Sequence, residues 1–556
     1  MDYKKLADLL FPNIDKDIDY YLNKFPKRNL PAGAQVTRIA PSPTGFLHLG
    51  TAYGALIDYL TAKKTNGVFY MRLEDTDQKR EIKDAGQIAY DMLCYYNITP
   101  DEGYRGNQPQ LGDYGDYVQS RRVEIYHAFA KHLVSIGRAF PCFCEKSENK
   151  EDILARRSEQ LENADNIEAK DVCRNLTYEQ IEQNIKQGKP FALRLLSLGD
   201  GEKTFEFVDL IKGKRTLREN NKDIVLLKSN GIPPYSLAHL VDDVLMGTTI
   251  VVRGEEWYPS LSAHLELFDA CNMPRLQYAH TPVICKLDDQ GNKRKLSKRK
   301  DPEADARYYI EHGYPKQAVV EYLLNLLNSD FENWRAQNPT TDYHEFDFDI
   351  TKMGSNNPMF DMVKLSDVSK NLISLYTPED IYENVLTWAK SYDADFYQIL
   401  LNNKEKSLHL FSIDRVNTPK PRKDIAKWSE VPALYNYIYD EMYKPTKLSD
   451  FDFDAKFDKQ TLKSVLLAYK PVYDVNDDKQ VWFDKIKSIC EPLGFCADMK
   501  TYRKNPEGFV GSVADVSGII RVALTGKRNT PDLYEISKLL NQDGVSARIQ
   551  RVIDML

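Results

Sequence analysis

The sequence predicts an α/β protein, with a parallel sheet in its first half and mainly helices in its second. Strand-like and helix-like apolar patterns alternate between residues 35 and 95, and strand patterns return at 223–227 and 249–252. This order is typical of parallel sheets, because parallel strands need a crossover connection. Beyond Asp301 the apolar period is helical, as in Ala318–Leu327, which predicts helices for the rest of the chain.

The expected elements follow one another along the chain. A short helical extension ends in Pro and Gly residues, a strand and a helix follow, and a second strand and helix complete the first unit of the sheet. A charged segment then interrupts the pattern and indicates an insertion. In order, these elements are residues 1–34, Val36–Ile39, the helix carrying Tyr53, Leu56, Ile57 and Leu60, Val68–Leu73, the helix from Ile82 to Leu93, and the insertion at 139–222.

Composition excludes several classes of protein. The chain has 556 residues with 75 Lys and Arg against 82 Asp and Glu, so it is long enough for several domains and carries a net charge of −7. An apolar content of 42% excludes a disordered chain. Neither a signal peptide nor an 18-residue apolar run occurs, and the eight cysteines are irregularly spaced, so we expect a cytoplasmic protein without a membrane segment.

A loop between the first strand and the first long helix reads RIAPSPTGFLHLGT, residues 38–51. At this place an open α/β sheet exposes backbone N–H groups and a helix N-terminus to anions. Gly45 and Gly50 let the backbone approach a ligand closely, and His48 can donate a hydrogen bond to a phosphate oxygen. The pattern favours a phosphate-binding loop over a Pro-rich connector.

A second motif is the basic run KRKLSKRK at residues 293–300, in which six of eight residues are cationic. A charge run is usually a solvated loop. Here Ser297 lies between lysines and Leu296 supplies an apolar anchor, which suits a loop that closes over a polyphosphate. A further basic segment, PKPRK at 419–423, fits a contact with tRNA phosphate and a solvated turn equally well.

Together the two motifs resemble the class I aminoacyl-tRNA synthetases. HLGT at 48–51 stands for their His-Ile-Gly-His signature and KLSKR at 295–299 for their Lys-Met-Ser-Lys-Ser loop. The stretches PSPTGFLHLG (41–50), MRLEDTDQKR (71–80), LLKSNGIPPYSLAHLVDDVLMGTTIVVRGEEW (226–257) and KLSKRKD (295–301) are similar to the bacterial-type glutamyl-tRNA synthetase family. GSVADVSGIIRVALTGKRNTPDLYEISKLL (511–540) resembles the end of that family's helical anticodon-binding region.

The resemblance covers the chain from about residue 35 to its end and implies a domain order. It implies a Rossmann-type parallel-sheet catalytic domain with an inserted connective domain that binds the tRNA acceptor, then mainly α-helical stem-contact and anticodon-binding domains. We expect the N-terminal extension to have a packing role only. The boundaries are 1–34 for the extension, 35–138 and 223–280 for the catalytic domain, 139–222 for the insertion, 281–370 for the stem-contact region with the KLSKR loop, and 371–556 for the anticodon-binding region.

The resemblance implies a glutamate–tRNA ligase, which activates L-glutamate with ATP to glutamyl-adenylate and transfers it to the 3′-terminal adenosine of tRNA(Glu). The substrate carboxylate is the nucleophile, so the chemistry needs alignment and cations rather than a Ser/His or Cys/His pair. His48 and Lys298 are the expected catalytic residues, with Lys295 secondary, and Mg²⁺ should be held by the nucleotide and water. The expected ATP-binding residues are His48, Gly50, Thr51, Glu256, Leu296, Ser297 and Lys298.

Glutamate brings two carboxylates and one ammonium group, so its pocket needs two cations and one anion. Glu74 can take the ammonium, while Arg38 and Arg253 can each form a forked pair with a carboxylate. The resemblance implies a glutamate pocket made of Arg38, Ala40, Ser42, Glu74, Tyr235, His239 and Arg253.

Three departures from the family pattern stand out. Thr51 replaces the second histidine of the class signature, and His239 stands where the family usually has Asn. Some relatives bind zinc in the insertion through Cys-x-Cys and a later Cys-x-His. The chain keeps the three thiols, Cys142, Cys144 and Cys173, but has Asn175 for the histidine, and Asn is a poor zinc ligand. An insertion without metal is therefore favoured over a zinc site, which water, Asp171 or Glu145 would have to complete.

Three other functions fit the sequence less well. A glutaminyl-type synthetase tends to carry a β-barrel anticodon region and would have no use for a cation opposite a neutral amide. A short paralogue that glutamylates a tRNA base lacks an anticodon domain, and a non-catalytic tRNA-binding relative usually loses the phosphate-loop residues. The expected partners are therefore L-glutamate and tRNA(Glu), with no membrane, and the family is usually monomeric.

Overall fold

The computed structural model describes residues 1–43, 45–76, 82–144, 173–297 and 299–556. The chain forms two compact units. The first contains residues Met1–Tyr308 and Val320–Asp361, and the second contains Tyr309–Val319 and Met362–Leu556.

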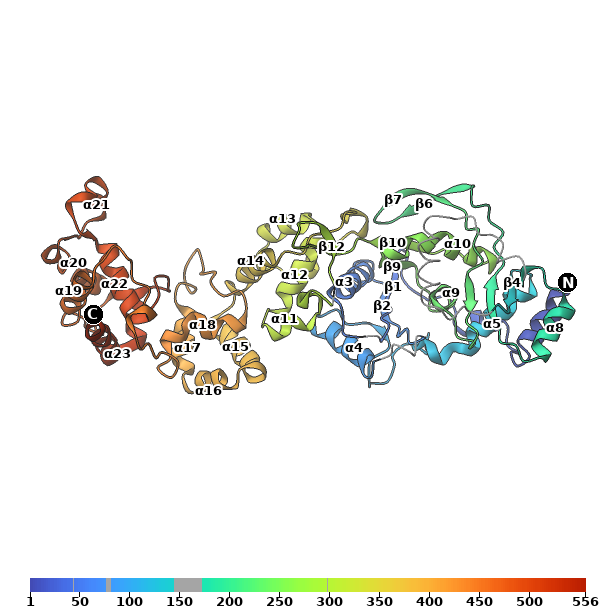
Figure 1. Ribbon diagram of the computed structural model, residues 1–556, viewed down its shortest axis with the longest axis horizontal. Helices are drawn as coiled ribbons and strands as arrows, with labels where there is room; N and C mark the ends of the chain where they lie inside the picture. Colours follow the sequence, from blue (N-terminus) through green and yellow to red (C-terminus); the bar gives the residue numbers. More distant parts are fainter. Residues whose placement is uncertain (44, 77–81, 145–172, 298) are drawn as a thin grey trace. The chain divides into compact units, whose positions relative to one another are not determined.

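A parallel sheet lies at the centre of the first unit (Figure 1). Strands β1 (Val36–Ile39), β2 (Val68–Met71) and β3 (Glu102–Gly103) are parallel and adjacent in that order, and β9 (Ile250–Gly254) pairs in parallel with β10 (Gln277–Thr281). The Thr249 N–H donates to the Val36 carbonyl at 2.9 Å, which brings β9 alongside β1. Strand order therefore reverses between β1 and β9, the place where open α/β sheets bind ligands beyond the carboxyl ends of their strands.

The helices that follow the strands agree with the apolar periods of the sequence. α3 (Leu49–Lys64) directly follows the loop after β1, and its apolar positions Leu56, Ile57 and Leu60 are buried. The second helix, α4 (Ala85–Tyr95), begins three residues later than its pattern indicates. Asp84 precedes it with a left-handed φ of 63°, a conformation that a helix interior excludes.

The insertion has its own sheet. β4 (Ala139–Cys142), β5 (Ala192–Leu195) and β8 (Val225–Leu227) are antiparallel neighbours, and β6 (Thr204–Asp209) forms a hairpin with β7 (Gly213–Arg218). The expectation that the parallel sheet resumes at 223–227 is wrong. An apolar run indicates a strand but not its partner, and this strand pairs antiparallel with β5 instead.

The N-terminal extension packs against this unit. α1 (Tyr3–Leu10) and α2 (Ile18–Lys24) bury Leu6 and Tyr21 in one cluster with Phe129 of α5 (Val123–Ser135). The following segment is held by charge as well, since the Arg28 guanidinium makes two 2.9 Å hydrogen bonds to the Glu102 carboxylate. The remaining helices of this part are α8 (Tyr178–Lys186), α9 (Tyr235–Leu245) and α10 (Leu261–Ala270).

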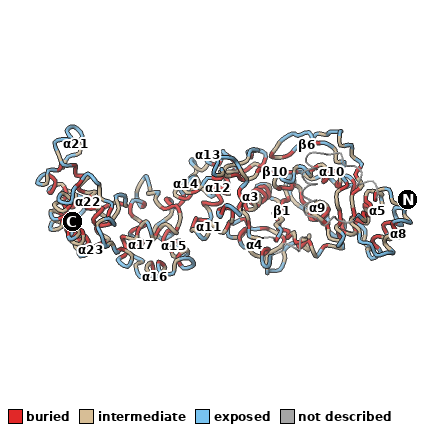
Figure 2. Tube along the Cα trace, in the orientation of Figure 1, coloured by how far each residue is buried: buried red, intermediate tan, exposed pale blue. Residues whose placement is uncertain are grey.

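A hairpin of β11 (Cys285–Leu287) and β12 (Lys293–Lys295) leads into the basic run, and helices follow it. The next helices are α11 (Arg307–Glu311), α12 (Lys316–Leu327) and α13 (Asp330–Gln337). In Figure 2 the trace of the parallel strands is coloured as buried, in agreement with the burial of β2 and β9.

The second unit is almost entirely helical, as the sequence predicts. Its apolar core joins residues far apart in the chain, from Ile373 to Ile553. No helix in the described part of the chain is long and apolar enough to cross a membrane. The elements are α14 (Met362–Ile373), α15 (Pro378–Tyr392), α16 (Ala394–Asn402), α17 (Lys404–Ser412), α18 (Val431–Tyr435), α19 (Lys459–Tyr469), α20 (Lys479–Ser488), β13 (Phe495–Cys496), α21 (Met499–Lys504), β14 (Gly511–Ser512), α22 (Val513–Thr525) and α23 (Leu533–Met555).

The basic segment 419–423 lies in this unit, and one of its side chains faces inward. Arg422 is only 12% exposed and lies 2.9 Å from an Asp424 oxygen, and its guanidinium also donates to the Tyr435 hydroxyl at 3.3 Å. Lys423 is exposed. The interpretation of this segment as a solvated turn is therefore wrong for Arg422, which is a structural residue. A contact with tRNA phosphate stays a prediction for Lys423.

Candidate functional site

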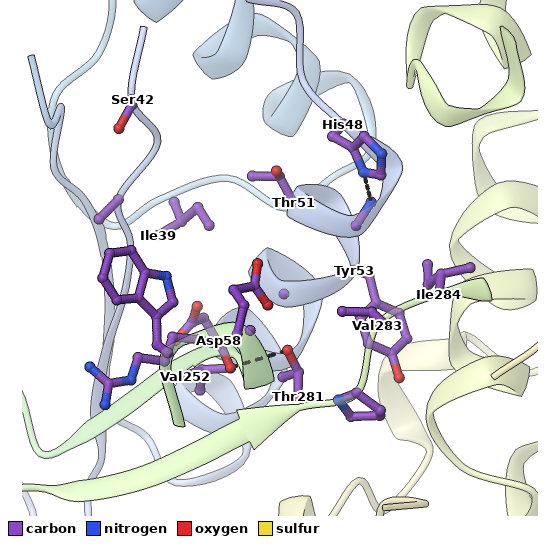
Figure 3. Close-up of a pocket in the computed structure, with 18 of the residues that line it drawn as sticks. Ile39, Ser42, His48, Thr51, Tyr53, Asp58, Val252, Thr281, Val283 and Ile284 are labelled. Atoms are coloured by element: carbon purple, nitrogen blue, oxygen red, sulfur yellow. Dashed lines mark hydrogen bonds between the residues drawn. The ribbon is translucent and has the colours of Figure 1, made fainter. Parts of the chain in front are cut away.

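A cavity of about 400 Å³ opens at the carboxyl ends of β1, β9 and β10. In Figure 3, Ser42 and His48 lie at one end of it and Thr281 at the other. The cavity is lined by Arg38, Ile39, Ala40, Ser42, His48, Gly50, Thr51, Tyr53, Gly54, Asp58, Glu74, Tyr235, Val252, Arg253, Gly254, Glu256, Trp257, Thr281, Pro282, Val283, Ile284 and Lys295.

The structure therefore gathers most of the predicted site residues around one cavity. Three of those that it describes do not line it: Leu296 and Ser297, which follow β12, and His239 on α9. Lys298, the principal cation of the predicted loop, lies outside the described residues.

His48 is the N-cap of α3. Its Nδ1 accepts a 2.8 Å hydrogen bond from the Gly50 N–H, which is drawn in Figure 3. Since Nδ1 accepts, the ring proton of the neutral imidazole is on Nε2, where it can be donated to an anion. The helix N-terminus adds the positive end of the helix dipole, which favours phosphate.

The base of the basic loop is anchored on both sides of residue 298. Leu296 is buried, and its N–H donates to the Ile284 carbonyl at 2.9 Å. Asp301 is also buried and receives two hydrogen bonds from the Arg294 guanidinium, at 2.6 and 2.7 Å, and one of 2.9 Å from the Ser297 N–H. These donors lower the pKa of Asp301 to about 2, so its charge persists at any ordinary pH.

Arg38 enters the cavity wall already paired with a carboxylate. Its Nε lies 3.2 Å from Asp243 Oδ1, and a second guanidinium N–H donates to the Val252 carbonyl at 3.0 Å. Arg72 also pairs with Asp243, at 2.6 Å, and with Glu74, at 2.9 Å. The surrounding cations hold the pKa of Asp243 well below its usual range against the cost of burial.

Arg253 has different partners. Its Nε donates to His280 Nε2 at 3.0 Å, and one Nη donates to His264 Nδ1 at 3.0 Å and to the Tyr235 hydroxyl at 3.4 Å. Its guanidinium also lies 4.7 Å from the centre of the Tyr278 ring. Within the described ranges no carboxylate pairs with Arg253, and its other Nη is buried without a hydrogen-bond partner.

Tyr235 and His239 form a stack behind Arg253. The centres of their rings are 5.0 Å apart and the rings are nearly parallel. The Trp257 ring also packs against the Tyr235 ring, with ring centres 4.3 Å apart. His239 is fully buried, with Nδ1 2.5 Å from Asp243 and Nε2 2.9 Å from the Tyr278 hydroxyl. Both ring nitrogens therefore bond to protein groups, and His239 supports the wall instead of forming part of its surface.

Two acidic side chains in the cavity have raised pKa values. Burial raises the pKa of Glu74, although the Arg72 pair opposes this effect. Burial raises the pKa of Asp58 much further, and one Asp58 oxygen has no hydrogen-bond partner among the described residues. The neutral form of Asp58 is therefore favoured, whereas the Glu74 carboxylate is held by Arg72 at 2.9 Å.

Sequence reasoning did not identify several residues that shape this site. Some lie outside the recognised motifs, and others, such as Arg72 and Asp243, lie inside them without a role that the motif assigns, so only the fold brings them close. The consecutive acids of the LVDDVL stretch on α9 were the one visible signal, because paired acids are rarely buried without cations. The residues are Asp58, Arg72, Asp209, Asp242, Asp243, His264, Thr281 and His280.

The three predicted thiols also come together. The sulfur atoms of Cys142, Cys144 and Cys173 lie within 4.8 Å of one another, and those of Cys144 and Cys173 are 3.5 Å apart. Three thiols at this spacing suit a soft metal such as Zn²⁺. The candidate fourth ligands Glu145 and Asp171 lie outside the described residues.

Two families of known domains match the chain. Residues 35–365 match the catalytic domain of the class I tRNA synthetases for E and Q, and residues 512–553 match an anticodon-binding domain. The first match contains every residue that lines the cavity.

Full-length relatives are also similar. The chain is 45% identical to the glutamate–tRNA ligase of Acetivibrio thermocellus, with 100% of both chains covered. It is 42% identical to that of Clostridium perfringens strain 13, with 99% of this chain and 100% of the relative covered. A crystal structure of a glutamate–tRNA ligase from Elizabethkingia meningosepticum has the same fold, with a TM-score of 0.72 and 23% identity over 94% of this chain and 99% of the other.

Proposed function

The chain belongs to the class I tRNA synthetases of glutamate and glutamine and is a glutamate–tRNA ligase, and from this premise we propose how its cavity works. L-Glutamate binds beside β9 and α9, ATP binds between the His48 loop and the KLSKR loop, and the glutamyl group passes to the 3′-terminal adenosine of tRNA(Glu). A glutaminyl-type enzyme is the alternative that the site chemistry disfavours.

The observation that carries the proposal is the environment of Arg253. Its hydrogen-bond acceptors are imidazole nitrogens and a hydroxyl, all neutral, so no carboxylate in the described part of the chain balances its charge. A buried cation without a counter-charge is costly, and an anionic ligand removes that cost. The side-chain carboxylate of glutamate meets this need, whereas the neutral amide of glutamine does not.

The other two charges of glutamate have candidate partners on β1 and in the segment after β2. Glu74 offers a carboxylate to the ammonium group, and the lining residue Arg38 offers N–H groups to the α-carboxylate. Arg38 is already paired with Asp243, so it orients the nucleophilic carboxylate without holding it as strongly as an unpaired cation would. Weak holding suits a group that must attack, because the ground state should not be over-stabilised.

Activation forms one bond and breaks one. An oxygen of the α-carboxylate attacks the α-phosphorus of ATP, the bond from that phosphorus to the bridging oxygen breaks, and pyrophosphate leaves with the electron pair. His48 can donate from Nε2 to a phosphate oxygen, and Lys295 and Lys298 add positive charge from the other side. Gly50, Thr51, Glu256, Leu296 and Ser297 complete the proposed ATP site.

Mg²⁺ would neutralise the β- and γ-phosphates of ATP, and the cavity fits an ion carried in by the nucleotide. The carboxylates that line the described cavity are already engaged or neutral: Glu74 pairs with Arg72, Glu256 lies 3.3 Å from Lys295, and Asp58 has a raised pKa. Phosphate oxygens and water are therefore the proposed Mg²⁺ ligands.

The remaining parts of the chain have proposed roles in binding tRNA. We assign acceptor binding to 139–222, stem contact to 281–370 and anticodon binding to 371–556, and the anticodon-binding match at 512–553 supports the last assignment. We further propose a monomer. Zinc is not assigned, since Asn175 replaces the histidine of the metal-binding pattern.

Pyrophosphate exchange tests the proposal. The purified chain is incubated with ATP, labelled pyrophosphate and either glutamate or glutamine, with and without tRNA(Glu). We expect label to enter ATP with glutamate, and glutamine to be disfavoured by roughly 10⁴-fold in kcat/KM, the range for sites built around one polar partner. Equal exchange with glutamine would favour the glutaminyl-type alternative, and no exchange under any condition would favour a non-catalytic relative.

A further inference from the structure

Arg253 is held by two histidines, and the other ring nitrogen of each histidine has a second hydrogen-bond partner. His280 lies on β10 and donates from Nδ1 to Asp209 Oδ2 at 2.6 Å. His264 lies on α10, and its Nε2 is 3.2 Å from the Ser236 hydroxyl. Three of these residues are deeply buried: His264, His280 and Asp209 are each at most 1% exposed.

The hydrogen bonds determine the tautomers. An arginine N–H can only donate, so His280 Nε2 and His264 Nδ1 must both be acceptors. His280 then carries its proton on Nδ1, facing Asp209, and His264 carries its proton on Nε2, facing Ser236. The two rings therefore have opposite tautomers, and both turn a lone pair toward the same guanidinium.

Burial supports this assignment. It lowers the pKa of His280 and lowers that of His264 much further, so both rings are neutral at physiological pH. Asp209 keeps its charge, because the His280 ring and the N–H groups of Ile211 and Lys212, at 3.0 and 2.8 Å, donate to it. The Asp209 charge is thus separated from Arg253 by a neutral ring.

We propose that Asp209 is a positioning residue for substrate selection, acting through His280 to keep Arg253 oriented and without a carboxylate partner, while His264 turns its lone pair toward the same guanidinium. If either ring took the other tautomer, an imidazole N–H would face a guanidinium N–H and the arginine would be displaced. Asp209 comes from β6 of the insertion, so a strand outside the parallel sheet determines the geometry of the glutamate pocket. The inference rests on the proposed role of Arg253.

The first test reads the tautomers directly in the full-length chain. Long-range ¹⁵N–¹H correlation spectra of histidine-labelled protein distinguish Nδ1–H, Nε2–H and imidazolium rings. The nine histidines can be assigned with His280→Gln and His264→Gln variants. We expect the Nδ1–H form for His280 and the Nε2–H form for His264 at pH 7. The same tautomer in both, or an imidazolium in either, would overturn the proposal without touching the role of Arg253.

The second test uses kinetics. Asp209→Asn should lower kcat/KM for glutamate about tenfold to a hundredfold, the usual effect of losing a partner that orients a ligand-binding histidine. The loss should fall mainly on the KM for glutamate, narrow the preference over glutamine and leave the KM for ATP within about twofold. Tyr258→Phe is the matched control, because Tyr258 packs against His280 with ring centres 5.1 Å apart but its hydroxyl has no hydrogen-bond partner in the part of the chain that the structure describes.

A comparison of two variants of His280 separates an effect on the position of Arg253 from an effect on folding. The amide oxygen of His280→Gln can still accept from Arg253, whereas His280→Phe cannot. At equal melting temperature, His280→Gln should therefore retain more of the preference for glutamate over glutamine than His280→Phe. These two variants test the proposal even if Asp209→Asn does not fold. Equal losses in the two variants, or a parent-like Asp209→Asn, would overturn it. An active Arg253→Ser variant in the same assay would instead overturn the proposed function.

Discussion

Arg38 and Asp243 form an ion pair inside the protein, with Arg38 Nε 3.2 Å from Asp243 Oδ1 and neither side chain more than 4% exposed. Arg253, on the neighbouring strand β9, has only neutral partners among the described residues. The two arginines look equivalent in the sequence, but one is already neutralised and the other is not. Arg253 is therefore the better selector of a negatively charged side chain, and Arg38 the better guide for the reacting carboxylate.

Replacing Arg253 should remove both activity and selectivity. In Arg253→Ser we expect glutamate activation to collapse and the preference over glutamine to narrow, because the counter-charge for the side-chain carboxylate is lost. Arg253→Lys should not restore full activity, since an ammonium lacks the planar fork. The measurement is kcat/KM for both amino acids with tRNA present. If activity is lost while the preference ratio persists, Arg253 holds the α-carboxylate and Arg38 is the selector.

Removing a phosphate-side donor should affect the rate of activation most. We expect Lys298→Ala to lower the activation rate by about 10²-fold or more, the usual cost of one preorganised charge at a transition state. Glutamate and ATP affinities should change much less. His48→Ala should behave similarly and also weaken ATP binding. Single-turnover pyrophosphate exchange measures the rate, and a parent-like Lys298→Ala would show that the loop has another role.

The basic segment of the helical unit offers a matched pair of variants. Charge reversal at the exposed Lys423 should raise the KM for tRNA and reduce the salt slope of binding by about one unit if this lysine contacts a phosphate. Arg422→Ala should instead destabilise the fold, by about 1–3 kcal/mol, because its guanidinium is bonded to Asp424 and Tyr435. An unchanged salt slope for the Lys423 variant would leave the segment a solvated turn.

The N-terminal extension should contribute stability and not catalysis. Leu6 is almost fully buried in the core that α1 shares with α5, so Leu6→Ala should cost about 2–5 kcal/mol of unfolding free energy. Lys4→Ala, on the exposed face of the same helix, should change stability little. Glutamate activation well below the melting temperature should be equal in both. Lower activation in Leu6→Ala at that temperature would give the extension a functional role.

Asp58 should make the protein less stable as pH rises. Its folded-state pKa is raised well above that of the unfolded chain, so the folded state binds a proton that the unfolded state releases above about pH 4. Stability is therefore lost with increasing pH until the folded-state pKa is passed. Asp58→Asn removes this pH-dependent loss of stability and should raise the melting temperature more at pH 8 than at pH 5. The exposed Asp289→Asn is the control, and an equal gain at both pH values would contradict the assignment.

The local sequence pattern was sufficient to predict several helices and strands of the first unit and many of the residues that line the cavity. Val36–Ile39 forms β1 as expected, and the following loop places His48 at the start of α3, because apolar period and capping are properties of a few neighbouring residues. The segments that follow β1 and β9 also begin at the same edge of the parallel sheet. Arg38 and Arg253, more than 200 residues apart, therefore line one cavity.

Only the tertiary structure decided which partner each charged or apolar group takes. The strand at 225–227 pairs with the insertion, Arg422 faces its own unit, and His239 bonds to Asp243 and Tyr278 behind the wall. The sequence by itself determined the family motifs, the helical second half and a part of the residues that line the cavity. It did not determine that Arg253 meets neutral rings while Arg38 meets Asp243, because burial and counter-charge depend on groups that are distant along the chain.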